Sequence, residues 1–131
     1  MKPEIIVKLL LIGEGFAPKD ISKKLNIEPS TTWLKGDLKK DRKIEIKRKD
    51  NGWIFSLEPE KTFDLDKEII KVLNCFESKK DELLSIQKEY GLKFRLQCEI
   101  FTEDQYPSIW LTNDLLILIT KFGFDLNISI Y

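Results

Sequence analysis

Apolar and polar residues alternate with a period of two in several stretches of the chain, and this alternation predicts β-strands. Residues 5–12 are apolar on both faces apart from Lys8. This predicts a central strand, or a strand whose second face meets a partner. Residues 92–101 and 124–131 each combine one apolar face with a mostly polar one, so we expect these strands to pack on one side only.

A β-hairpin is predicted at Asn51 and Gly52, because a two-residue type I′ turn requires positive φ at both of its positions. The pairing that this turn imposes gathers the neighbouring apolar residues on one face. A slip by one residue would scatter them over both faces. The opposite face of the hairpin would then carry Lys43, Lys47 and Lys49.

Four segments follow a helical period instead. A short helix is predicted after Pro18, and a second over residues 65–76, capped by Asp64. The third should end before Gly91, and the fourth should begin after Thr112. The fourth is apolar on all sides, so we expect it to be well buried.

The predicted order of elements is β-α-β-β-α-α-β-α-β. We therefore expect an α+β two-layer sandwich: a mostly antiparallel sheet of about five strands, with helices on one face. The length of 131 residues suits a single domain spanning residues 1–131. Hydrophobic residues make up 42% and charged residues 34%, a globular composition that argues against disorder.

Charge and residue content narrow the function classes. There are 22 basic and 22 acidic residues, so no net field attracts nucleic acid or an anionic membrane. The chain has no histidine, which excludes histidine-based triads and zinc sites. The carboxylates have no spacing that demands acid–base chemistry, and no phosphate-binding glycine motif occurs. We predict neither enzymatic activity nor a cofactor or metal.

The cysteines and the N-terminal segment indicate where in the cell the protein is located. Cys75 and Cys98 lie among apolar residues, so both are interpreted as small core residues, with a redox pair or metal site as the alternative. The first apolar run is interrupted by Lys8 and has no small-residue cleavage site, which argues against a signal peptide. No apolar stretch reaches the roughly 20 residues that span a bilayer. A cytoplasmic protein is expected.

Three groups of residues resemble the motifs of a known family. The first comprises Ile21, Leu25, Ile27 and Pro29, followed by Thr31, Trp33, Lys35, Gly36 and Asp37. The second is Gly52-Trp53, and the third is the closing segment over residues 123–131, where Asn127 stands in place of an expected acidic residue. Together they resemble a bacterial family catalogued as a domain of unknown function, number 4279. The resemblance implies a small single-domain bacterial protein and carries no activity with it.

The loop over residues 31–37 is the first candidate site. Trp33 offers a large flat surface, and Lys35 and Asp37 supply opposite charges beside it, so this loop could bind a peptide or a small polar ligand. The alternative is that Trp33 anchors the loop against the core and that Gly36 and Asp37 form a turn.

The second candidate is the basic run over residues 35–49, which contains eight basic and three acidic residues. A ribbon that presents Lys43, Lys47 and Lys49 could contact phosphates. The alternative is a solvated edge hairpin, because exposed lysines also protect sheet edges from aggregation.

The third candidate is an apolar patch on the polar face of the sheet. It would contain Leu10, Ile12, Phe101 and Tyr131, with Ile6 beside them. Such a patch commonly marks a protein interface. The alternative is a covering loop, either the Trp33 loop or residues 106–110.

We therefore expect a non-enzymatic interaction module that binds an unidentified protein partner, an immunity-type inhibitor being one form of it. Self-association is a further expectation. The alternative is a nucleic-acid or small-ligand binder that uses the basic hairpin and the Trp33 loop, although the balanced charge makes nucleic acid the less favoured partner. No membrane partner is predicted.

Overall fold

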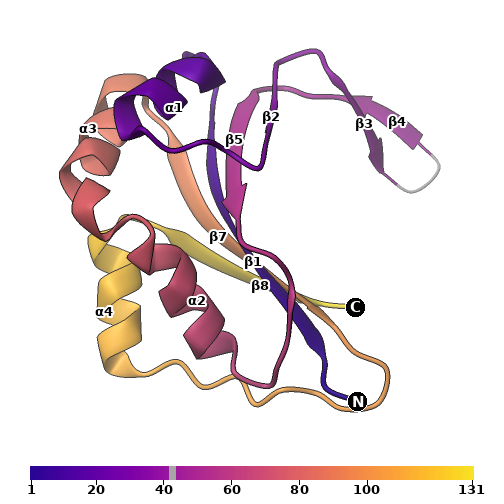
Figure 1. The fold of residues 1–131 in the computed structure, drawn as a ribbon. Helices are drawn as coiled ribbons and strands as arrows, with labels where there is room; N and C mark the ends of the chain where they lie inside the picture. The colour runs from indigo at the N-terminus through magenta and orange to yellow at the C-terminus, as the bar shows by residue number, and fades with distance from the viewer. Residues whose placement is uncertain (42–43) are drawn as a thin grey trace.

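The computed structural model describes residues 1–41 and 44–131, which form a mixed sheet with four α-helices on one of its faces (Figure 1). The strands lie in the order β2-β5-β1-β7-β8, and β6 pairs with the start of β1. Their bounds are β1 Glu4–Gly13, β2 Thr31–Trp33, β5 Asn51–Ser56, β6 Glu60–Lys61, β7 Lys93–Phe101 and β8 Asp125–Ile130. The α+β class and the one-sided helix layer are confirmed.

The sheet is mostly antiparallel. The central strand β1 is antiparallel to β5, β6 and β7. Among the described strands, β8 alone is parallel to its neighbour, β7, because helix α4 carries the chain back between them. The prediction of residues 5–12 as a central strand is confirmed.

The helices are α1 Pro18–Leu25, α2 Leu65–Asn74, α3 Lys80–Tyr90 and α4 Asn113–Lys121, with a 3₁₀ turn at Glu77–Lys79. Two of the expected end signals are present, whereas the Asp64 side chain, which was expected to cap α2, makes no capping hydrogen bond. The Thr112 hydroxyl accepts the Leu115 N–H at 3.2 Å and caps α4. Gly91 ends α3 at a φ of 63°, a left-handed conformation that favours glycine.

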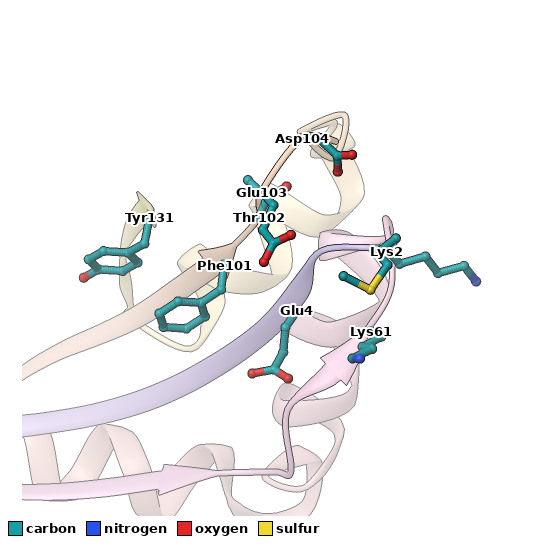
Figure 2. Close-up of a pocket in the computed structure, with 9 residues that line it drawn as sticks. Lys2, Glu4, Lys61, Phe101, Thr102, Glu103, Asp104 and Tyr131 are labelled. Atoms are coloured by element: carbon teal, nitrogen blue, oxygen red, sulfur yellow. The ribbon is translucent and has the colours of Figure 1, made fainter.

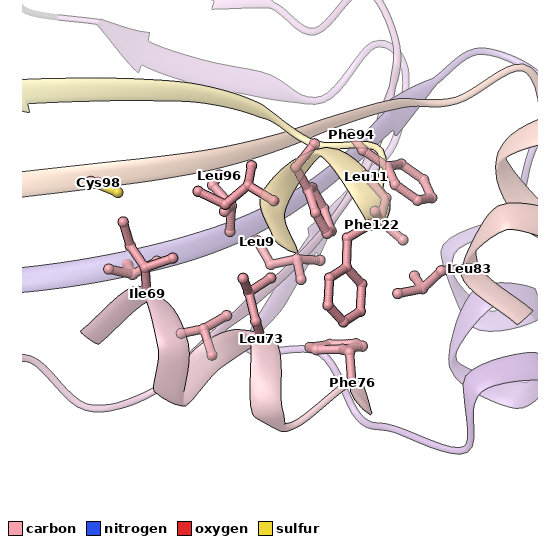
Figure 3. Packing of buried hydrophobic residues seen from close by; sticks show 14 of the residues in the cluster. Leu9, Leu11, Ile69, Leu73, Phe76, Leu83, Phe94, Leu96, Cys98 and Phe122 are labelled. Atoms are coloured by element: carbon pink, nitrogen blue, oxygen red, sulfur yellow. The ribbon is translucent and has the colours of Figure 1, made fainter. Parts of the chain in front are cut away.

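The core lies between the sheet and the helices (Figure 3). Alternate residues of β1 and β7, such as Leu9 and Leu96, point toward Ile69 and Leu73 of α2. Trp53 of β5 is completely buried, and its indole N–H donates to the Ser22 hydroxyl of α1 at 3.0 Å. Each such buried large side chain contributes roughly 1.5–3 kcal/mol to the stability of the fold.

The predicted hairpin at Asn51 and Gly52 is wrong. Both residues lie inside β5, which pairs with β1 and β2. The hairpin forms upstream instead, between β3 (Leu38–Asp41) and β4 (Ile44–Lys47). Gly52 is needed for close packing, because a Cβ at this position would lie 2.2 Å from the ring of Trp33.

Two expectations about burial are also wrong. Cys98 is buried, but Cys75 is exposed just after the end of α2, outside that helix's buried stripe. Helix α4 buries Leu115 and Ile119 but exposes Leu116 and Ile117, because it covers β8 at the border of the helix layer. An apolar helix sequence therefore produced a helix with one buried and one exposed apolar side.

Candidate functional site: an open sheet face and a projecting arm

The face of the sheet opposite the helices, here called the open face, remains in contact with solvent. On β1 the residues of the core face are buried, whereas Ile6, Lys8, Leu10 and Ile12 are only half-buried. The loop over residues 102–112 runs from β7 to α4 past the start of α2 (Figure 1). Trp110 of this loop lines a cavity together with Phe63. The loop therefore does not cover the open face.

Strand register divides the open face into an apolar and a polar half. Leu10 pairs with Ile54 on β5, and Ile12 pairs with Gly52, on which Trp33 lies. On the other side, β7 and β8 contribute Arg95, Gln97, Glu99, Asp125, Asn127 and Ser129.

The polar half is internally hydrogen-bonded. The Gln97 amide donates to the Ser129 hydroxyl at 3.1 Å and accepts from the Asn127 amide at 2.8 Å. Lys8 and Glu99 form an ion pair at 2.7 Å between the two halves. Four of the six polar residues of β7 and β8, Gln97, Glu99, Asn127 and Ser129, are therefore paired with each other or with Lys8.

The hairpin β3–β4, here called the arm, projects from the sheet on the side opposite the helices (Figure 1). Its two strands pair only with each other among the described residues. Leu38, Ile44 and Ile46 are 64%, 65% and 42% exposed. A two-stranded hairpin with exposed apolar residues on both faces is marginally stable alone, so a contact partner would stabilise it.

The base of the arm, in contrast, is tightly held. Trp33 is 9% exposed, and its ring lies on Gly52 and is covered by the Arg48 guanidinium at 4.0 Å. Its indole N–H donates to Asp50 at 3.2 Å. The expected loop is wrong at its start, because Thr31–Trp33 forms strand β2 and pairs with β5. The anchoring role that the sequence left open for Trp33 is present, and its role in binding stays a prediction.

Backbone hydrogen bonds close the same base. The Arg48 N–H donates to the Asp37 carbonyl at 2.7 Å, and the Gly36 N–H donates to the Arg48 carbonyl at 2.9 Å. The Asp37 carboxylate accepts the Leu34 N–H at 2.8 Å, and Asn51 accepts the Lys35 N–H at 2.7 Å. Both predicted site residues, Lys35 and Asp37, thus lie in this turn, with the Asp37 carboxylate occupied and Lys35 exposed.

Phe101 and Tyr131 lie at the opposite end of the open face. Their rings stack at 5.1 Å and border a shallow cavity of about 380 Å³ with Glu4, Lys2 and Lys61 (Figure 2). Phe101 pairs with Glu4 and Lys93 with Ile12, so the two ends are about 26 Å apart at the usual rise per strand residue. The predicted patch is therefore two clusters, one at each end of β1.

The basic residues are distributed differently from the prediction. Lys47 lies on β4 of the arm, whereas Lys49 follows the arm and borders a cavity with Lys93 and Tyr90. The prediction for Lys43 lies outside the described residues. The common ribbon face for these lysines depended on the Asn51-Gly52 turn, and that pairing does not exist.

Sequence reasoning missed the exposed apolar residues of the arm. Ile44 and Ile46 alternate with polar residues as a core-facing strand would, and the predicted Asn51-Gly52 hairpin placed them on one apolar face with Trp53. The usable signal was the density of lysines around them, which is untypical of a strand that packs on the body of a domain.

The shifted pKa values among the described residues belong to a buried thiol and to lysines paired with carboxylates. Burial raises the pKa of the Cys98 thiol from 9.0 to about 12, which keeps it protonated. The Glu68 carboxylate raises the pKa of Lys71 by accepting its hydrogen bond. Within residues 1–41 and 44–131, no group of three carboxylates or thiols could hold a metal ion.

The fold and this surface define a small α+β protein with one sheet face and one arm free for contact. The chain belongs to the family described as Domain of unknown function (DUF4279), whose model matches residues 3–131. The family that the sequence motifs resemble is thereby confirmed. Neither the curated proteins nor the solved structures contain a match. None of the helices in the described part of the chain is long and apolar enough to cross a membrane.

Proposed function

We propose that this chain is a non-enzymatic protein-interaction module that holds a partner protein against its open face with the arm. The exposure of Leu38, Ile44 and Ile46 on a hairpin that pairs only with itself, among the described residues, carries the proposal. Apolar residues placed outside a core in this way are typical of an interface. The half-buried strip of Leu10, Ile12 and Ile54 lies beside the base of the arm and extends that surface.

Charge indicates the chemistry of the partner. Residues 35–49 hold eight basic and three acidic residues, although the whole chain has 22 of each, so the arm is basic and the rest of the chain is acidic. A partner with an apolar centre and an acidic rim complements this distribution. An inhibitor of the immunity type fits the proposal, because such a protein acts by occupying a partner's surface.

A phosphate backbone would also complement the basic arm, but one observation favours a protein. Single-stranded nucleic acid is usually bound by stacking bases on exposed aromatic rings. Trp33, the aromatic residue nearest the arm, lies between Gly52 and Arg48 and has no free ring face.

We also propose a cytoplasmic location in a bacterium, which two free cysteines support.

Photocrosslinking in cells tests the proposal. A benzoyl-phenylalanine residue is introduced at Ile46 on the arm, at Leu10 on the open face, or at Leu84 on the helix layer. The same partner protein should crosslink from Ile46 and Leu10 but not from Leu84, and Ile44→Asp should abolish both crosslinks. Crosslinks only from Leu84 would refute the proposed surface.

A mobility-shift assay with single- and double-stranded DNA and RNA, at low and moderate salt, tests the alternative. Binding that weakens steeply with salt and is lost in Lys39→Glu/Lys47→Glu would favour a nucleic-acid partner over a protein. Absence of a shift at low salt would remove that alternative.

A further inference from the structure

Strand β8 forms one border of the sheet, and its outer backbone groups have no partner in the described chain. Natural edge strands are usually short, or are protected by lysine, proline or a bulge. β8 runs over six residues, contains no lysine or proline, and has Asp125 as its one charged residue. The opposite edge, β2, is three residues long and leads into the base of the arm.

The backbone N–H and C=O groups of β8 point alternately toward β7 and away from the sheet. The Tyr131 N–H donates to the Ile100 carbonyl at 2.8 Å, and the Tyr131 carbonyl accepts the Thr102 N–H at 3.2 Å. Odd-numbered residues therefore direct their backbone groups toward β7. Because this direction alternates along a strand, Leu126, Ile128 and Ile130 direct theirs away from the sheet.

We propose that β8 pairs with β8 of a second copy of this chain, antiparallel and centred on Ile128. In this register Ile128 faces Ile128 of the other chain, and Leu126 faces Ile130 of the other chain. Every outward backbone group of the strand therefore finds a partner. The side chains also match, because Leu126, Ile128 and Ile130 lie on the helix side in both copies. The proposal is independent of the proposed function.

Helix α4 favours a second copy over an isolated peptide strand. It turns directly into β8, with the Phe124 N–H donating to the Ile119 carbonyl at 3.2 Å. Its exposed Leu116 and Ile117 would remain in water beside a lone peptide, whereas a second copy brings its own α4 alongside. A stable dimer buries about 800 Å² per partner, which requires this helix surface in addition to the strand.

Electrostatics do not oppose the pairing. The chain has equal numbers of basic and acidic residues, so two copies carry no net repulsion. In the Ile128-centred register Asp125 faces Tyr131 of the other copy and stays away from the second Asp125.

Sedimentation equilibrium over a range of concentrations tests the dimer. The unmodified protein should form dimers, and Leu116→Lys/Ile130→Lys should weaken dimerisation by at least about tenfold, with circular dichroism unchanged. The matched control is Ile70→Lys/Leu84→Lys, at two positions that are each 37% exposed, close to the 44% and 46% of Leu116 and Ile130. A protein that stays monomeric at all concentrations, or a control that weakens the dimer equally, would overturn the proposal.

Disulfide crosslinking tests the register without disturbing the apolar residues. Asn127 and Ser129 are expected to face each other across the two copies as a non-hydrogen-bonded pair, with a Cα separation of about 4.5 Å that suits a disulfide. In a Cys75→Ser background, a mixture of Asn127→Cys and Ser129→Cys proteins should crosslink much faster than either protein alone. Equal rates in the mixture and in the separate proteins would refute this register.

Discussion

At the scale of single residues, two motifs that are distant in the sequence form one packing unit. Gly52 leaves the space that the Trp33 ring fills, and Arg48 covers the other face of the ring. Asn51 completes the unit, because its side-chain amide donates to the Phe16 carbonyl at 2.8 Å and its oxygen accepts the Lys35 N–H. These residues hold the base of the arm on the sheet.

Gly52→Ala should therefore destabilise the protein by roughly 1–3 kcal/mol, since a methyl group would overlap a ring that is fixed on both sides. Gly15→Ala is the matched control, because a Cβ there meets no atom within 4 Å. Urea unfolding followed by tryptophan fluorescence measures both variants. A Gly52 variant as stable as the Gly15 variant would contradict this packing.

The Cys98 thiol makes stability depend on alkaline pH. Burial raises its pKa from 9.0 to about 12, so between these values the unfolded thiol ionises while the folded one stays protonated. The contribution to stability is complete below pH 9 and is lost as the pH rises toward 12. The unfolding free energy of the unmodified protein should thus fall more steeply over this window than that of Cys98→Ala, and parallel curves would contradict the burial effect.

At the scale of elements, the arm and the sheet are held by different forces. The sheet and helices share one buried core, whereas β3 and β4 pair only with each other among the described residues and keep their apolar side chains in solvent. The backbone bonds between Asp37 and Arg48 and between Gly36 and Arg48 close the turn beneath the arm. The arm thus resembles an appendage whose removal leaves the core contacts intact.

Replacing residues 38–47 by a two-residue Asn-Gly turn should change the unfolding free energy by less than about 1 kcal/mol, because none of the described residues of the arm belongs to the core and the loop becomes shorter. Thermal unfolding measured by circular dichroism reports this change. The same variant should lose the crosslink from Leu10 to the partner protein. A large loss of stability would show that the arm packs on the body of the domain.

At the scale of the whole molecule, basic charge and exposed apolar residues occur together on the arm, away from the core. The arm is basic, the remainder of the chain is acidic, and the open face lies between the arm and the Phe101–Tyr131 end. In the proposed dimer the two-fold axis is perpendicular to the sheet, so both open faces point the same way and both arms project on the same side. One assembly would then present two copies of the partner surface side by side.

Reversing the charge of the arm tests the electrostatic part of this arrangement. Lys39→Glu/Lys47→Glu should lower the association rate with the crosslinked partner by at least about tenfold at low salt and remove most of its salt dependence. Lys88→Glu/Lys121→Glu, which changes the net charge equally but lies on the helices, is the control. Stopped-flow fluorescence measures the rates, and equal effects of the two variants would contradict steering by the arm.

Local patterns in the sequence were enough to predict the long strands, the four helices and the apolar face of the sheet, but not the short strands β2, β3 and β6. Alternation marked residues 5–12 and 92–101 as strands, and Pro18, Gly91 and Thr112 marked helix ends, because these signals act within a few residues. Tertiary structure alone decided what Asn51-Gly52 does, which end of the sheet Phe101 and Tyr131 occupy, and that Ile44 and Ile46 stay in solvent. The physical reason is the distance in sequence over which each signal acts. A local pattern specifies which face of a strand is apolar. Pairing partners and register depend instead on contacts such as Trp33 on Gly52, which join segments that no local pattern connects.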